Sequence, residues 1–352
     1  MPDQTATLPT SLSQTKPFAN VDAIRAALRN LSVANEARIA EARARQATLT
    51  KPPGSLGMLE DIACFLAGWQ ADGPRAETIH VLVFAGNHGV VRQGVSPFPA
   101  EVTAQMVANF EHGGAAINAL AKAYGLTLKV TPLDLDRPTE DFSEAEAMSD
   151  ADFLAAFNAG AAAVDGNADV VALGEMGIGN TTAAAALAAA TFGGMGIDWA
   201  GSGTGLDSAG VRHKADVIDH ALARHAAKLG DPLEVMRVLG GRELAALAGA
   251  TLQARRLGIP VIVDGYITTA AIAPLARIAP DALAHCIAGH VSREQGHRRL
   301  LENLSLPALL DLGMRLGEGS GAAVAAAVVR GAVATHRGMA TFEEAAVSNK
   351  PG

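Results

Sequence analysis

The sequence has little of what defines several large classes of protein. Of its 352 residues only two are cysteines, 4% are aromatic and 18% are charged, and acidic residues outnumber basic ones by 36 to 28. Cys64 and Cys286 cannot form a disulfide framework, so we expect buried thiols and a cytoplasmic location. The formal net charge of −8 argues against nucleic acid as a partner, because binding phosphates along a strand requires a basic face.

The chain also lacks a leucine-rich hydrophobic run. Its longest uncharged stretch, residues 176–197, is long enough to span a bilayer but consists mostly of alanine and glycine. We therefore expect no membrane segment. The first twenty residues are polar and lack the apolar region of a signal peptide, which predicts a mobile N-terminal arm over residues 1–20.

What the chain does contain is aliphatic residues and glycine. Hydrophobic residues make up 49% of the sequence, and there are 37 glycines, a composition that excludes a disordered chain. The length predicts one large domain and a smaller one. We expect the large α/β domain over residues 76–321, and a small helical domain built from residues 21–75 and 322–352.

Short apolar runs alternate with helical periodicity along most of the chain. The predicted strands are 79–86, 126–135, 168–173, 260–264 and 284–288. The predicted helices are 21–48, 56–69, 99–124 with a weak point at 113–114, 152–163, 181–191, 214–229, 242–257, 268–278, and two that begin at 297 and 321. Residues 136–152 are acidic and polar, which predicts an exposed excursion. The alternation predicts an α/β fold with a parallel sheet covered by helices on both faces.

The strongest local signal is a glycine-rich turn between a strand and a helix, Gly-Glu-Met-Gly-Ile-Gly-Asn-Thr-Thr at 174–182. Ligands of parallel sheets bind beyond the carboxyl ends of strands, and backbone N–H groups at a helix N-terminus attract anions. We expect Gly177, Gly179, Asn180 and Thr181 to bind a phosphate. The alternative is a tight turn with Asn180 or Thr181 as the helix N-cap. The spacing fits neither a Walker A motif nor G-x-G-x-x-G.

A second glycine loop, residues 201–207, precedes Lys214, which we expect to open the next helix. With Gly203, this lysine is a candidate to neutralise the same phosphate. The alternative is a solvated lysine at a helix start.

A third glycine-rich segment, Leu-Gly-Glu-Gly-Ser-Gly at 316–321, places Glu318 among glycines before an apolar helix. Apolar surroundings raise the pKa of a carboxyl group, which suits a general base. The alternative is an acidic residue that complements the helix dipole.

Single polar residues follow other strands. His88 and Asp264 stand at strand ends, where each is either a site residue or a structural group. His285, His290 and His297 lack metal-ligand spacing, so we expect no metal site.

Taken in order, these motifs resemble one known family. In the first half they are Lys-Pro-Pro-Gly-Ser-Leu-Gly at 51–57, Gly-Asn-His-Gly-Val at 86–90 and Gly-Val-Ser at 94–96. In the second half they are the 174–182 turn, Gly-Thr-Gly-Leu-Asp at 203–207, Asp-Gly at 264–265 and Arg-Leu-Gly-Glu-Gly-Ser-Gly at 315–321. Over residues 21–350 the chain resembles the nicotinate-nucleotide–dimethylbenzimidazole phosphoribosyltransferases, which prepare the lower ligand of cobalamin.

The resemblance implies a reaction and a fold. The phosphoribosyl group of nicotinate mononucleotide passes to 5,6-dimethylbenzimidazole, giving α-ribazole 5′-phosphate and nicotinate, with no cofactor. The implied fold is a Rossmann-like parallel sheet with a small helical domain formed by both termini, in a homodimer.

The resemblance also implies roles for particular residues. Glu318 matches the family's catalytic base, and Glu175 matches a second active-site carboxylate. The other matches are Lys214 near the nucleotide, and Met176 and Leu316 in the pocket for the aromatic base. We add His88 to that pocket and Asp264 to the nucleotide side. Asn87 stands where the family usually has Asp, a departure that leaves no charge at this position.

Two other functions are weighed against this one. A nicotinamide-dependent oxidoreductase would carry G-x-G-x-x-G after its first strand, and residues 86–89 do not supply that pattern. A non-catalytic nucleotide-binding module would keep the 177–182 turn but would not need Glu318 in an apolar setting.

Overall fold

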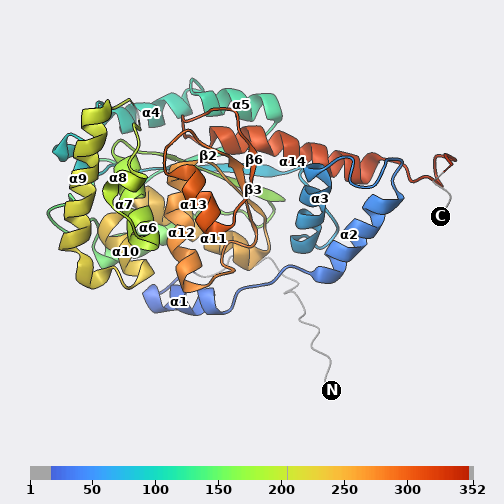
Figure 1. The fold of residues 1–352 in the computed structure, drawn as a ribbon, viewed down its shortest axis with the longest axis horizontal. Coiled ribbons are helices and arrows are strands. Elements are labelled where there is room, and N and C mark those ends of the chain that lie inside the picture. Colours follow the sequence, from blue (N-terminus) through green and yellow to red (C-terminus); the bar gives the residue numbers. More distant parts are fainter. Residues whose placement is uncertain (1–16, 204, 349–352) are drawn as a thin grey trace, which may run out of the picture.

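The protein is built around one parallel sheet, described here from a computed structural model covering residues 17–203 and 205–348 (Figure 1). The sheet has six strands in the order β2-β1-β3-β4-β5-β6, and every neighbouring pair is parallel. The strands are β1 (Ile79–Ala85), β2 (Thr127–Pro132), β3 (Val170–Met176), β4 (Val261–Val263), β5 (Cys286–His290) and β6 (Ala308–Leu310). The predicted parallel α/β sheet is confirmed.

The central strands are apolar at successive positions because both of their faces are covered. In β1, Leu82 and Phe84 belong to the core on one face, and Val81 and Val83 belong to the core on the other. The edge strand β2 is only half-buried. The three-residue strand β6 was not predicted, although the equally short β4 was, because β6 is only half-buried and follows directly on Pro307.

The larger core lies on the face covered by most of the helices. They are α1 (Val21–Arg29), α6 (Asp150–Ala163), α7 (Asn180–Phe192), α8 (Gly196–Trp199), α9 (Ser208–Arg224), the 3₁₀ turn η2 (Ala226–Lys228), α10 (Pro232–Leu239), α11 (Arg242–Leu257), α12 (Tyr266–Ile278) and α13 (His297–Leu304). Much of this core is alanine, which lets helices approach one another and the sheet closely.

The opposite face is covered by α3 (Met58–Trp69), α4 (Glu101–Glu111), α5 (Ala116–Tyr124) and the long α14 (Ser320–Gly338). Figure 1 shows α14 running across the sheet toward α3 and α2 (Glu36–Thr48). An antiparallel bridge between Leu49 and Thr341 joins the segment after α2 to the segment after α14. The division into two domains at the predicted boundaries stays a prediction.

The predicted arm at the N-terminus falls mostly on residues 1–16, which lie outside the described residues. Phe18, at its end, is buried against Phe157, with ring centroids 5.5 Å apart. Its backbone N–H donates to Asn158 Oδ1 at 2.7 Å. Residue 18 is therefore anchored to the larger core.

The prediction of one continuous helix over residues 21–48 is wrong, because this segment forms two helices. α1 ends at Arg29, and α2 starts after Asn35, whose side chain accepts a hydrogen bond from Arg38 N. Asparagine favours such capping positions over helix interiors. The weak point expected at 113–114 is the real break between α4 and α5.

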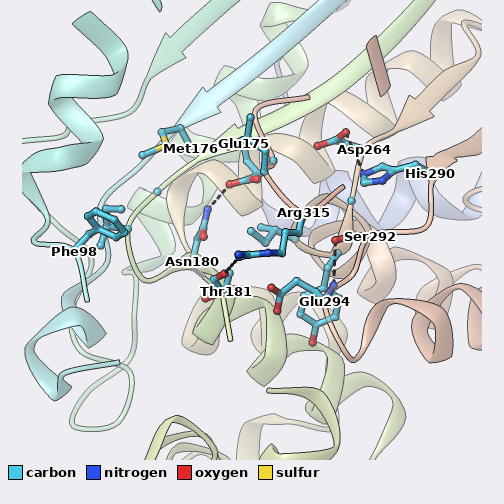
Figure 2. A pocket seen from close by; sticks show the side chains of 18 residues that line it. Phe98, Glu175, Met176, Asn180, Thr181, Asp264, His290, Ser292, Glu294 and Arg315 are labelled. Atoms are coloured by element: carbon cyan, nitrogen blue, oxygen red, sulfur yellow. Dashed lines mark hydrogen bonds and ion pairs between the residues drawn. The ribbon is translucent and has the colours of Figure 1, made fainter. Parts of the chain in front are cut away.

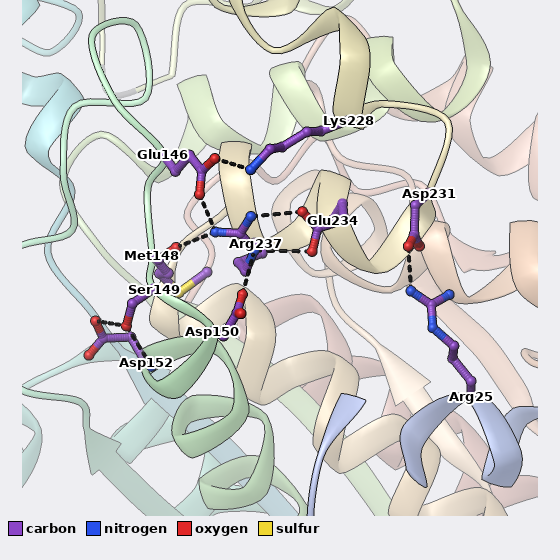
Figure 3. A network of polar contacts seen from close by, with 10 residues as sticks. All are labelled: Arg25, Glu146, Met148, Ser149, Asp150, Asp152, Lys228, Asp231, Glu234 and Arg237. Carbon is purple, nitrogen blue, oxygen red and sulfur yellow. Dashed lines mark hydrogen bonds and ion pairs between the residues drawn. The ribbon is translucent and has the colours of Figure 1, made fainter. Parts of the chain in front are cut away.

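The exposed excursion predicted over residues 136–152 is only partly right: Asp136, Arg137 and Glu144 are exposed, but other residues of the segment belong to the interior. Phe142 is fully buried, and Asp141 and Met148 are nearly so. Figure 3 shows how polar contacts hold this segment: Arg237 of α10 pairs with Glu146 and donates to the carbonyl oxygen of Met148 at 3.0 Å. Two of the acidic residues of this segment, Glu146 and Asp150, pair with the buried guanidinium of Arg237.

Helix α10 itself was missed, although its start carries a clear signal. Asp231 is the N-cap, and Pro232 follows it at the first helical position. The predicted start of α9 at Lys214 was late as well, since the helix begins at Ser208 after the N-cap Asp207. Among the described residues, no helix is long and apolar enough to cross a membrane.

Candidate active site

A cavity of about 480 Å³ opens at the carboxyl ends of β3, β4 and β5 (Figure 2). This is where a parallel sheet is expected to bind a ligand, and the volume suits a small molecule. The lining residues come from the glycine-rich turns of the sequence and from the segments after β4 and β5: Phe98, Glu175, Met176, Gly177, Ile178, Asn180, Thr181, Gly203, Asp264, Gly265, Tyr266, Ile267, His290, Ser292, Glu294, Arg315, Leu316 and Gly317.

The turn after β3 brings backbone and side chains to the cavity together. Helix α7 begins at Asn180, and its N-cap is Gly179 in a left-handed conformation (φ 93°) without a side-chain cap. The alternative in which Asn180 or Thr181 caps the helix is therefore wrong. Asn180 and Thr181 instead line the cavity, and so does Gly177. Gly179 lies behind the turn, next to His88 and Val91.

Glu175 is buried at the base of this turn. Asn180 Nδ2 donates a hydrogen bond to its carboxylate, as Figure 2 shows. Burial raises the pKa of Glu175 to about 8, and the nearby carboxylates of Asp264 and Glu243 add to the rise. At neutral pH this carboxyl group is mostly protonated and has an O–H to donate.

Glu318 follows Gly317, which lines the cavity, but is buried and is not itself one of the lining residues. Its backbone is left-handed (φ 62°), a conformation that costs free energy for any residue other than glycine. The loop packs so closely on β3 that a Cβ at Gly174 would lie 2.5 Å from Gly319 N. Burial raises the pKa of Glu318, while a hydrogen bond from the Ile117 N–H opposes the rise, and Glu318 Oε2 has no partner among the described residues.

Asp264 and His290 stand side by side at the ends of β4 and β5, with Asp264 Oδ1 3.7 Å from His290 Nε2. Asp264 accepts a hydrogen bond from Ala322 N at 2.8 Å, at the start of α14. Burial raises the pKa of Asp264 to about 7 in spite of this bond. Both residues line the cavity, as predicted for Asp264.

Lys214 is buried behind Thr181, so the alternative of a solvated lysine is wrong. Its Nζ donates to Thr181 Oγ1 at 3.1 Å and to the Gly201 carbonyl at 3.2 Å. Burial lowers the pKa of Lys214 to about 8, with partial compensation from the charge of Glu294. A Cβ at Gly203 would lie 3.2 Å from this Nζ, so glycine there keeps the lysine close to the cavity.

The opposite side of the cavity is apolar. Met176 and Leu316 line it, as expected, and Phe98 joins them. Leu316 is 58% exposed and Phe98 46% exposed, which leaves apolar surface for a flat, apolar ligand. The aromatic Phe98 was not singled out from the sequence.

His88 does not line the cavity. It is 1% exposed, and its Nε2 is hydrogen-bonded to Glu243 Oε1. Its neighbour Asn87 is buried too, and Asn87 Nδ2 donates to the Leu135 carbonyl at 2.9 Å. The amide at position 87 thus makes a bond to a backbone carbonyl that a carboxylate could not make.

Sequence reasoning missed further polar residues of the cavity. Arg315 donates through Nη1 to the Gly203 carbonyl at 2.9 Å, which ties the second and third glycine segments together. Ser292 and Glu294 follow β5, and Glu294 Oε2 is buried without a hydrogen-bond partner among the described residues. Ser292 and Glu294 could have been found by their position directly after a strand, which is the reason that Asp264 was predicted.

The histidines do not assemble with acidic residues or cysteines as ligands. Over residues 17–203 and 205–348, no group of three or more His, Cys, Asp or Glu side chains is arranged to hold a metal ion. Cys64 and Cys286 are buried free thiols, as predicted.

Comparison with known proteins identifies the class. A model of the phosphoribosyltransferase family matches residues 31–347. The nicotinate-nucleotide–dimethylbenzimidazole phosphoribosyltransferase of Mesorhizobium japonicum is 58% identical over 335 residues, which cover 95% of this chain and 100% of that protein. The protein of the same name from Novosphingobium aromaticivorans is 58% identical over 333 residues, with coverage of 94% and 98%.

A solved structure agrees. The crystal structure of the Thermus thermophilus protein of this name is 40% identical, with a TM-score of 0.82 over 90% of this chain and 99% of that one. The fold and the cavity thus define a phosphoribosyltransferase. Within that class, the chain belongs to the nicotinate-nucleotide–dimethylbenzimidazole phosphoribosyltransferases. The resemblance drawn from the sequence is confirmed.

Proposed function

We propose that this protein transfers the 5-phosphoribosyl group of nicotinate mononucleotide to 5,6-dimethylbenzimidazole, producing α-ribazole 5′-phosphate and nicotinate for cobalamin assembly. The observation that carries the proposal is the division of the cavity. One side is an apolar wall of Met176 and Leu316, with the buried Glu318 two residues after Leu316 in the same loop, and a polar end contains Thr181 with Lys214 behind it.

The nucleotide occupies the polar end. Its phosphate is bound by the backbone of Gly177 and Gly203 and by the side chain of Thr181, with the charge of Lys214 immediately behind them. Asp264 and the protonated Glu175 are placed to hydrogen-bond ribose hydroxyl groups. Asn180 keeps the Glu175 carboxyl group oriented.

The benzimidazole lies on the apolar wall. Its unprotonated ring nitrogen attacks C1′ of the ribose and forms the new C–N bond. The bond between C1′ and the nicotinate nitrogen breaks, and its electron pair neutralises the pyridinium. Attack from the face opposite the leaving group inverts the anomeric centre and gives the α-linkage.

One proton must be removed in this reaction. Attack acidifies the other ring N–H of the benzimidazole, and the Glu318 carboxylate accepts that proton. Since the pyridinium leaves without protonation, a single general base is sufficient, and such catalysis contributes roughly 10²–10⁴-fold. Much of the remaining acceleration comes from holding the two substrates in the correct orientation.

The direct test mixes the purified protein with nicotinate mononucleotide and dimethylbenzimidazole in a buffer without added metal. Nicotinate release, and its strict dependence on the benzimidazole, are followed by chromatography. Formation of α-ribazole 5′-phosphate in equal amount is the expected result. Absence of nicotinate release with any benzimidazole would rule out the proposed reaction.

We also propose that the protein works as a cytoplasmic homodimer. The family resemblance implies the dimer, and the exposed apolar side chain of Leu312, which does not line the cavity, is suited to being covered. Two free, buried thiols fit a reducing compartment. Light scattering after size exclusion tests the dimer, since a mass near 35.9 kDa would indicate a monomer.

A further inference from the structure

The Gly86–Val90 segment is one of the sequence motifs that do not line the cavity. Its histidine, His88, pairs with Glu243 in the first turn of α11, and both side chains are 0% exposed. Neither residue lines the cavity. A fully buried carboxylate costs several kcal/mol unless it is well paired, so an apolar pair would fill the same space at lower cost.

Glycines on three separate segments make room for this pair. A Cβ at Gly86, after β1, would lie 2.4 Å from Glu243 Oε2. A Cβ at Gly241, the N-cap of α11, would lie 2.2 Å from His88 Cε1. The pair is therefore enclosed by backbone at the carboxyl end of the sheet.

The third glycine, Gly177, belongs to the turn that lines the cavity. A Cβ there would lie 3.0 Å from Glu243 Oε1, 2.6 Å from the Gly86 carbonyl oxygen and 3.3 Å from Asn180 Nδ2. In the same turn, Asn180 is bonded to Glu175. The Glu243 carboxylate and the Asn180 amide thus both lie close to the backbone at Gly177.

We propose that His88 and Glu243 are positioning residues of the transferase. His88 fixes the orientation of the Glu243 carboxylate, and that carboxylate supports the Gly177–Asn180 turn in the conformation that binds the nucleotide. The inference rests on the proposed placement of the nucleotide at this turn. It predicts an effect on one substrate only, because the benzimidazole contacts the wall of Met176 and Leu316.

The test is steady-state kinetics of H88Q, E243Q and the double variant, with each substrate varied in turn. We expect the KM for nicotinate mononucleotide to rise about tenfold or more, and the KM for dimethylbenzimidazole to stay within about twofold. Because the two residues act as one unit, the double variant is expected to be no worse than the worse single variant. His225 provides the matched control: it is also a buried histidine, but its Nε2 bonds to the Phe142 carbonyl away from the cavity, so H225Q is expected to leave both KM values unchanged.

G241A is a second variant in case the polar substitutions prevent folding. It pushes the His88 ring and removes no polar group, and its φ of −154° is open to alanine. The same selective rise in the nucleotide KM is expected. Equal changes in both KM values, or a fall in kcat alone with both KM values unchanged, would overturn the inference.

K214A separates this inference from the proposal on which it rests. If K214A raises the nucleotide KM but neither G241A nor a folded H88Q does, only the positioning role of His88 and Glu243 fails. If K214A also leaves that KM unchanged, the placement of the nucleotide at the turn is wrong.

Discussion

The backbone N–H of Glu318 donates to the carbonyl oxygen of Glu175 at 3.3 Å. This bond joins two segments that are far apart in the sequence. The Glu175 side chain leaves toward Asn180, whereas Glu318 is directed to the Ile117 N–H at the start of α5. The proposed general base and the nucleotide-binding turn are therefore fixed relative to each other through β3.

The first prediction concerns Glu318 as the base. Glu318→Gln keeps the size of the side chain but cannot accept the proton, so we expect kcat to fall at least about 100-fold with nucleotide binding nearly unchanged. In the parent protein kcat falls as the pH is lowered through the raised pKa of Glu318, because the base is then protonated. The variant's residual rate should lose this dependence. The control is Glu302→Gln, which changes an exposed glutamate. Normal turnover of Glu318→Gln would exclude Glu318 as the base.

Much of this site could be predicted from the sequence. The turns at Gly177 and Gly203 carry a local pattern, since glycines beside a helix start expose backbone N–H groups, and Glu318 stands among glycines before an apolar helix. The role of Glu175 came from the family resemblance. Arg315 could not be assigned a contact, because its partner, the Gly203 carbonyl, is set by the packing of distant segments.

His88 was predicted to line the cavity and does not. Its place after β1 favoured the cavity, but its direction depends on Glu243, which lies on another element. The same reason explains the excursion at 136–152: a polar sequence looks exposed until its partner, the buried Arg237, is known. Strand and helix types follow from local pattern, whereas side-chain partners follow from tertiary packing.

The second prediction uses the raised pKa of Glu175, about 8. The folded protein holds this proton to a higher pH than the unfolded chain does. The stability associated with it is therefore complete below the ordinary glutamate pKa of 4.5 and is lost as the pH rises through about 8. Glu175→Gln cannot ionise, so its stability relative to the parent should improve by at least about 1 kcal/mol between pH 5 and pH 9. Thermal melts across this range measure the difference, and a constant difference would show that Glu175 is ionised in the fold throughout.

The third prediction concerns the charge of Lys214. Lys214→Met removes the ammonium group behind Thr181, and we expect the nucleotide KM to rise about tenfold with the benzimidazole KM unchanged. Because the pKa of Lys214 is lowered to about 8, nucleotide affinity of the parent should weaken as the pH rises through that value. The variant's affinity should be weak on both sides of it. The exposed Lys122 replaced by Met serves as the control, and an unchanged nucleotide KM in Lys214→Met would place the phosphate elsewhere.

The last prediction concerns stability away from the site. Arg237, with a side chain only 6% exposed, pairs with Glu146, with Asp150 at 3.0 Å and with Glu234 at 2.7 Å (Figure 3). Arg237→Ala leaves these carboxylates beside one another without their cation. We expect a loss of about 1–3 kcal/mol in the free energy of unfolding, which is less than for a fully buried pair because the carboxylates are partly exposed.

The pH dependence of this loss identifies its cause. Hydrogen bonds from Arg237 and then Lys228 hold the pKa of Glu146 at about 2, so the stabilisation is present above the ordinary glutamate pKa of 4.5 and is lost as the pH falls toward 2. Denaturant unfolding should therefore show parent and Arg237→Ala converging in acid. Arg298→Ala, which breaks the exposed pair with Asp311, should cost less than about 1 kcal/mol. If Arg237→Ala costs no more than Arg298→Ala at neutral pH, the 136–152 segment is held by the burial of Phe142 rather than by its charges.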